Sequence, residues 1–135
     1  MQTNLTIIGW ILVCLSLIHL GFPKYFQWRD DLQNISQINR EMMYVHTAFI
    51  GIVIFAMGIL CIFFQSELIY SEFGNQISLG LGIFWFIRLL VQFFGYSKDL
   101  WYGKLFETSI HILFSILWLY ISLSFIWIYK FANVP

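Results

Sequence analysis

Four long apolar stretches constrain the fold of this chain more than any other feature of its sequence. They cover residues 5–22, 43–64, 77–96 and 108–129. A helix needs roughly 20 apolar residues to cross the hydrocarbon core of a bilayer. In lipid, a helix also satisfies its backbone hydrogen bonds within one segment. We therefore predict four membrane-spanning helices at these positions.

The overall composition supports a membrane protein. Hydrophobic residues make up 60% of the chain and charged residues 10%, whereas soluble domains carry about 25% charged residues. The net charge is zero, which argues against electrostatic binding of nucleic acid. Cys14 and Cys61 lie singly in separate apolar stretches, so no disulfide framework is expected. We predict one all-α domain over residues 1–135, an integral membrane four-helix bundle.

The loops between the predicted spans indicate an orientation. Cytoplasmic loops of membrane proteins carry an excess of Lys and Arg. Loops 23–42 and 97–107 lie on one side and hold five basic residues, whereas the other side holds only Lys130. We therefore expect both loops to be cytoplasmic and both termini to lie outside. The five residues are Lys24, Arg29, Arg40, Lys98 and Lys104.

The first loop has the pattern of a short amphipathic helix at the membrane surface. Four apolar or aromatic residues recur at helical spacing, with polar residues on the opposite face. Pro23 suits a break between the first span and this surface helix, because proline has no backbone N–H. We predict an interfacial helix over residues 25–39. Its apolar residues are Tyr25, Trp28, Leu32 and Ile35.

A weak internal repeat also marks the chain. The first span closes with Gly21-Phe22-Pro23-Lys24 and the third with Gly95-Tyr96-Ser97-Lys98. Both are Gly-aromatic-x-Lys, and a tryptophan follows each. One interpretation is a parallel duplication of a two-helix unit. The other is that glycine, aromatic residues and lysine commonly end membrane spans.

The first copy of this motif belongs to a longer combination. His19 is followed by Pro23, Tyr25-Phe26 and Trp28, and then by Asn39-Arg40 and His46. The combination resembles a group of small bacterial membrane proteins, and the resemblance carries no activity with it. We expect a multi-pass protein of a bacterial inner membrane.

Polar residues within the predicted spans gather at one depth, near the cytoplasmic side. Ionisable residues inside a membrane normally face the protein interior and have a partner. Every span contributes at least one such residue, and all three histidines of the chain are included. Arg88 is always charged, and Glu107 is its nearest expected partner by depth. The predicted polar layer consists of His19, His46, Arg88, Gln92, Glu107 and His111.

Three functions are compatible with this layer. His19, His46 and His111 could ligate a transition metal or haem b, since neutral imidazole binds zinc, copper and iron. Arg88 could instead hold the oxygen of a quinone or lipid headgroup while a histidine exchanges a proton. The third function is a non-catalytic subunit or assembly factor that docks a membrane-protein partner or a second copy, with the polar layer holding the bundle together.

Several enzyme classes are not indicated. The sequence contains no Gly-rich phosphate loop, no nucleophile elbow and no His-Glu-x-x-His motif. No helix carries a polar stripe along its full length, as a pore would need. We expect binding of a cofactor or small ligand in the cytoplasm-side layer, with redox chemistry as one outcome.

Overall fold

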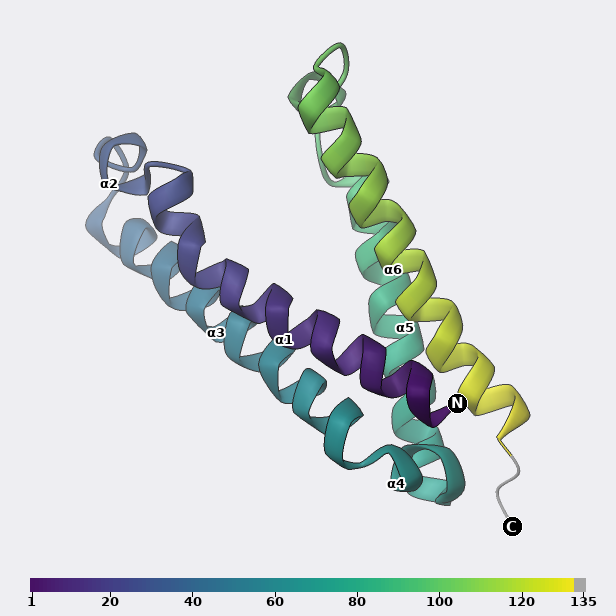
Figure 1. Ribbon diagram of the computed structural model, residues 1–135. Coiled ribbons are helices and arrows are strands. Elements are labelled where there is room, and N and C mark those ends of the chain that lie inside the picture. Colours follow the sequence, from purple (N-terminus) through teal and green to yellow (C-terminus); the bar gives the residue numbers. More distant parts are fainter. Residues whose placement is uncertain (133–135) are drawn as a thin grey trace. The chain divides into compact units, whose positions relative to one another are not determined.

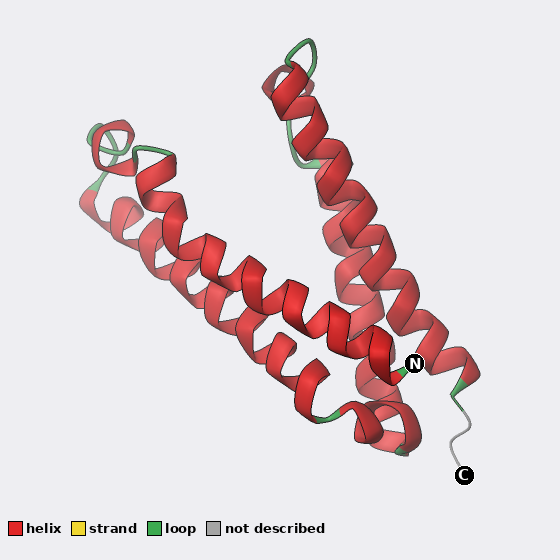
Figure 2. Ribbon diagram, viewed as in Figure 1, coloured by secondary structure: helices red, strands yellow, loops and turns green. Residues whose placement is uncertain are grey.

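The computed structural model describes residues 1–132, and these residues form helices and loops without a strand (Figure 2). Four helices are long and apolar enough to cross a membrane, which indicates a multi-pass membrane protein. They are α1 (Gln2–Tyr25), α3 (Gln37–Phe63), α5 (Glu72–Phe94) and α6 (Leu105–Phe131). All four predicted spans are therefore confirmed as apolar helices, and each helix is longer than its predicted stretch.

The chain divides into two compact units after Gln65. In the first, which we call hairpin 1, α1 and α3 lie side by side (Figure 1). In the second, hairpin 2, α5 lies beside α6. Each hairpin is described by itself below.

Glycine allows α1 and α3 to approach closely. A Cβ atom on Gly58 of α3 would lie 2.9 Å from the carbonyl oxygen of Gly9 and 3.1 Å from the amide nitrogen of Val13, both on α1. Side chains at these positions would separate the two backbones. Small residues serve close helix packing in this way in many membrane proteins, so Gly58 does not leave room for a cofactor.

The predicted interfacial helix over residues 25–39 is wrong in its extent. Only one turn, α2 (Trp28–Asp31), forms between the long helices. Pro23 does not end the first helix, which continues through it to Tyr25. The break comes instead at Gln27, whose φ of 50° lies in the left-handed region. From Gln37 onward the predicted surface helix is already the first part of α3.

Hairpin 2 begins at a tight corner between two helices. The short helix α4 (Gln65–Tyr70) precedes α5, in a segment that we predicted to be a loop. Ser71 caps α5, because its hydroxyl oxygen accepts a hydrogen bond from the Gly74 amide at 2.9 Å. A side chain on Gly74 would overlap the backbone carbonyl of Glu67, so this corner requires glycine.

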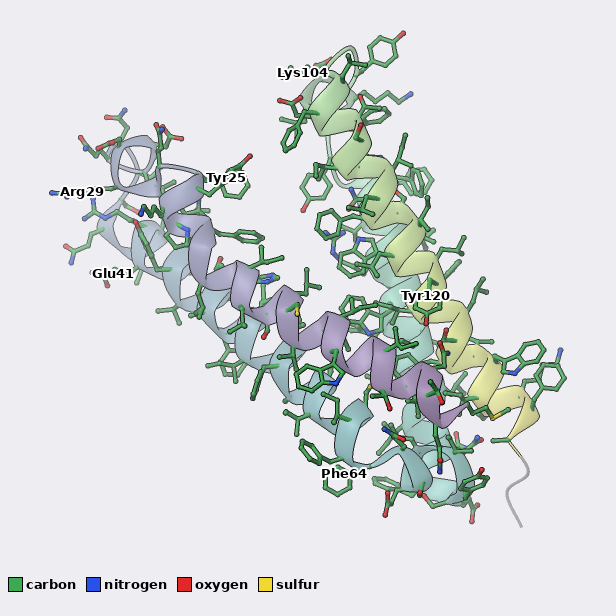
Figure 3. The ribbon with its side chains drawn as sticks, in the orientation of Figure 1. Tyr25, Arg29, Glu41, Phe64, Lys104 and Tyr120 are labelled. Carbon is green, nitrogen blue, oxygen red and sulfur yellow. The ribbon has the colours of Figure 1, made fainter. Side chains whose placement is uncertain are left out.

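The outer surfaces of both hairpins carry large apolar side chains. Examples are Phe49 on α3, Phe86 on α5 and Leu113 on α6, all exposed. Apart from Arg88, charged side chains lie at helix ends or in loops, as Arg29 and Glu41 do beside α2 and Lys104 does at the start of α6 (Figure 3). A soluble monomer rarely exposes apolar patches of this extent. The distribution agrees with the length and apolar character of the four candidate membrane spans.

Candidate functional site

Arg88 and Gln92 form the polar centre of hairpin 2. They lie four residues apart on α5, which places them on the same face of the helix. The Nη1 atom of Arg88 donates a hydrogen bond to Oε1 of Gln92 at 3.2 Å. Arg88 is half-buried and Gln92 is buried. Arg88 lies six residues before the end of α5, about 9 Å along the helix axis.

Aromatic rings surround the Arg88 guanidinium. Its central carbon lies 5.1 Å from the centroid of the Trp118 ring and 5.9 Å from that of Tyr96. Both distances suit an attraction between the cation and the electron-rich ring face. Trp118 in turn stacks on Trp85, with centroids 4.9 Å apart and planes 14° apart. Arg88 therefore lies against an aromatic platform supplied by both helices.

His111 connects the start of α6 to the last turn of α5. Its Nε2 atom lies 3.2 Å from the backbone carbonyl oxygen of Gln92. A carbonyl can only accept, so Nε2 carries the proton and donates it. Gln92 belongs to the last turn of α5, where carbonyl groups have no partner within the helix. The imidazole of His111 thus satisfies a helix-end carbonyl, which gives the buried ring a clear structural role.

The loop of hairpin 2 covers this histidine. Trp101 stacks on the His111 ring, with centroids 4.4 Å apart and planes 27° apart. The Thr108 hydroxyl donates a hydrogen bond to the Trp101 carbonyl oxygen at 2.6 Å and holds the loop in place. Trp101 therefore forms a lid over the His111 ring, a contact that no signal in the sequence indicates.

Glu107 lies outside this cluster. It belongs to the first turn of α6 and is exposed, whereas the expected partnership with Arg88 requires it to face the hairpin interior. The polar partner of Arg88 is the neutral amide of Gln92.

His19 and His46 belong to hairpin 1. The Nδ1 atom of His19 donates to the Leu15 carbonyl oxygen at 2.9 Å, and that of His46 donates to the Met42 carbonyl oxygen at 2.7 Å. Because Nδ1 carries the proton in each ring, Nε2 is the nitrogen that can accept a hydrogen bond or bind a metal. His19 is half-buried against Gly51, whereas His46 is exposed. The convergence of these two rings with His111 stays a prediction.

The described part of either hairpin contains no group of three His, Cys, Asp or Glu side chains close enough to hold a metal ion. The orientation of His19 and His46, with Nδ1 bonded to a carbonyl, is nevertheless the one that metal-ligating histidines adopt. Two shallow depressions lie on hairpin 1. The larger, of about 390 Å³, is lined by Asn39, Met42, Met43 and His46. The smaller, of about 160 Å³, is mainly apolar and lies beside Ser16 and Gly51.

Comparisons with known protein families, with curated proteins and with solved structures found no match to this chain. The site is therefore interpreted from its own geometry.

Proposed function

We propose that this chain is a multi-pass membrane protein that binds the headgroup of an amphiphile through Arg88. The proposal depends mainly on the surroundings of this arginine. Its side chain is half-buried on α5, and its one hydrogen-bonded protein partner in hairpin 2 is a neutral amide. A guanidinium presents five N–H donors in a fixed fork. A charged group inside a membrane normally has a partner, and here the ligand supplies it.

The ligand chemistry follows from the position of the site. An oxygen acceptor must reach a guanidinium about 9 Å from the end of α5, while the rest of the molecule stays in an apolar environment. The phosphate of a phospholipid and the carbonyl of a quinone both meet this requirement. The excess of basic residues in loops 23–42 and 97–107 favours the cytoplasmic leaflet.

The neighbouring residues have distinct roles in this proposal. Gln92 orients the guanidinium through its Oε1 atom, and Trp118 shields one face of it. His111 holds the end of α5 in place and so keeps Gln92 in position. With a quinone, the imidazole would also be the group of this cluster that exchanges a proton.

The alternative function is a structural or assembly subunit of a membrane complex, within a four-helix bundle. This alternative is supported by His111, because its buried ring is already hydrogen-bonded and stacked within hairpin 2 and needs no ligand. In this case Arg88 would meet an acidic group of a partner protein. The metal and haem versions stay predictions, which a Soret band or elemental analysis of the purified protein would support.

The test is a binding experiment on the full chain in nanodiscs of a neutral galactolipid, whose headgroup carries no phosphate. A phosphatidylglycerol probe and a short-tailed benzoquinone are titrated separately, and R88L is compared with R29L. Arg29 is exposed on α2, so R29L removes a charge without touching the site. We expect one probe to bind wild type and R29L equally, and R88L about 10- to 100-fold more weakly. Equal binding to all three proteins would refute the proposal and leave the structural alternative.

A further inference from the structure

In both hairpins, the two long helices approach each other closely at a glycine of the first helix, Gly9 in hairpin 1 and Gly82 in hairpin 2. In hairpin 1, a Cβ atom on Gly9 would lie 2.9 Å from the Gly58 carbonyl oxygen and 3.2 Å from Cβ of Cys61. In hairpin 2, a Cβ atom on Gly82 would lie 3.4 Å from Cβ of Phe125. The Ser122 hydroxyl also donates to the Gly82 carbonyl oxygen at 2.9 Å.

These contacts have the same register in both hairpins. Gly82 lies 73 positions after Gly9. The residues opposite them correspond as well, because Ser122 lies 64 positions after Gly58 and Phe125 lies 64 positions after Cys61. Thus α5 matches α1 with an offset of 73, and α6 matches α3 with an offset of 64.

The buried faces agree with these offsets. The buried residues of α1 are Leu5, Ile8, Gly9, Leu12, Leu15 and Ser16. Their counterparts on α5 are also buried, except that Arg88 is half-buried. These counterparts are Ser78, Leu81, Gly82, Trp85, Arg88 and Leu89. On α3, buried Ile54 corresponds to buried Trp118 on α6.

Helical periodicity alone reproduces an apolar face, but it does not require the same residue types at corresponding positions. Small residues correspond at Gly51 and Ser115 and again at Gly58 and Ser122. The polar residue near the end of α1, His19, corresponds to Gln92. The Gly-aromatic-x-Lys motifs are 74 positions apart, so they are shifted by one residue from this register. The structural match is therefore stronger than the motif that first indicated a repeat.

We propose that hairpin 2 is a second copy of hairpin 1, in which Trp85 and Trp118 are positioning residues for Arg88. Their counterparts in hairpin 1 are Leu12 and Ile54, and Arg88 corresponds to Leu15. At these three positions the first copy has only aliphatic side chains. The second copy has two stacked indole rings with the Arg88 guanidinium over one of them. The positioning role rests on the proposed function of Arg88, whereas the copy relationship does not.

The indole N–H groups support a role beyond packing. In the described chain, the Nε1 atoms of Trp85 and Trp118 are buried without a hydrogen-bond partner. An unpaired buried donor is unfavourable. Leu12 and Ile54 occupy the equivalent positions in hairpin 1 and bury no such donor. What the tryptophans provide in addition is a flat, electron-rich surface, and the guanidinium of Arg88 lies over it.

The register is tested by disulfide cross-linking of the full chain in a C14A/C61A background. Cβ atoms at positions 19 and 51 would lie 3.3 Å apart, within reach of a disulfide. The offsets predict that positions 92 and 115 behave in the same way. We expect H19C/G51C and Q92C/S115C to cross-link, but not the control Q92C/S122C, which is displaced by about 10 Å along α6. A cross-link in the control but not in Q92C/S115C would overturn the copy relationship.

The positioning role is tested with W85L/W118I, which installs the residues of the first copy. We expect this variant to keep its helical circular dichroism and to bind the probe that wild type binds about tenfold more weakly. W118F, which keeps a ring under Arg88, should restore part of the affinity. The control W10L/W127L removes two exposed tryptophans and should bind normally.

The outcomes separate the two claims. Unfolding of W85L/W118I would contradict the copy relationship, because equivalent positions of the two hairpins should tolerate the same pair of side chains. A folded W85L/W118I with wild-type affinity would contradict the positioning role. If R88L also binds like wild type, the proposed function fails, while the cross-links still decide the copy relationship.

Discussion

The guanidinium carbon of Arg88 lies 5.1 Å from the centroid of the Trp118 ring, although the two residues come from different helices. This contact, together with the hydrogen bond to Gln92, holds a permanent positive charge on a helix that is a candidate membrane span. The cluster thus combines a charge that needs a partner with a rigid aromatic support.

The geometry of the guanidinium is predicted to matter as well as its charge. R88K keeps the positive charge but loses the planar fork that can hold two oxygens at once. We expect R88K to bind the phosphatidylglycerol or benzoquinone probe about tenfold more weakly than wild type, equivalent to about 1.4 kcal/mol. Titration in nanodiscs measures this difference. Wild-type affinity in R88K would show that a point charge is sufficient.

His111 is predicted to stabilise the end of hairpin 2. H111A removes both the hydrogen bond to the Gln92 carbonyl and the stacking on Trp101. We expect a loss of about 2 kcal/mol in the free energy of unfolding, measured by thermal or chemical denaturation in detergent. The control is H46A, whose ring is exposed. Equal stability of H111A and H46A would contradict the role of His111.

The glycine contact in hairpin 1 gives a further stability prediction. G58V places a branched side chain against the backbones of Gly9 and Val13. Such overpacking typically destabilises a protein by about 1–3 kcal/mol, so the melting temperature of G58V should fall. G80V is the matched control, because a Cβ atom on Gly80 meets nothing within 4 Å. A larger loss in G80V than in G58V would be inconsistent with the observed packing.

The orientation in the membrane is predicted from the charges of the loops. A reporter that is active only outside the cytoplasm should be active when fused after residue 135 and inactive when inserted within residues 97–104. Reversal of both activities would place the Arg88 site in the opposite leaflet. The binding geometry would be unaffected, but the source of the ligand would change.

The sequence predicted the four long helices well, because each apolar stretch of about 20 residues has few alternatives in lipid. It was less informative about where helices end. Pro23 was expected to end α1, yet the helix continues for two residues beyond it to Tyr25, and the left-handed conformation of Gln27 follows that end. Such a backbone conformation at glutamine has no sequence signature.

The candidate site was also predicted in part. Arg88, Gln92 and His111 share one depth, and the structure brings these three together within hairpin 2. Depth alone did not determine the partners. The partner of Arg88 is Gln92 on the same helix, whereas Glu107 is exposed. The lid formed by Trp101 depends on the path of the loop.

The most direct test of the account is the affinity of the full chain for phosphatidylglycerol and for a short-tailed benzoquinone, measured for wild type, R88L and R29L in neutral nanodiscs. A charge-assisted hydrogen bond contributes about 1.5–3 kcal/mol. We therefore predict that R88L loses about 10- to 100-fold in affinity for one of the two probes, while R29L matches wild type. Affinities of R88L equal to those of wild type for both probes would contradict a headgroup site at Arg88.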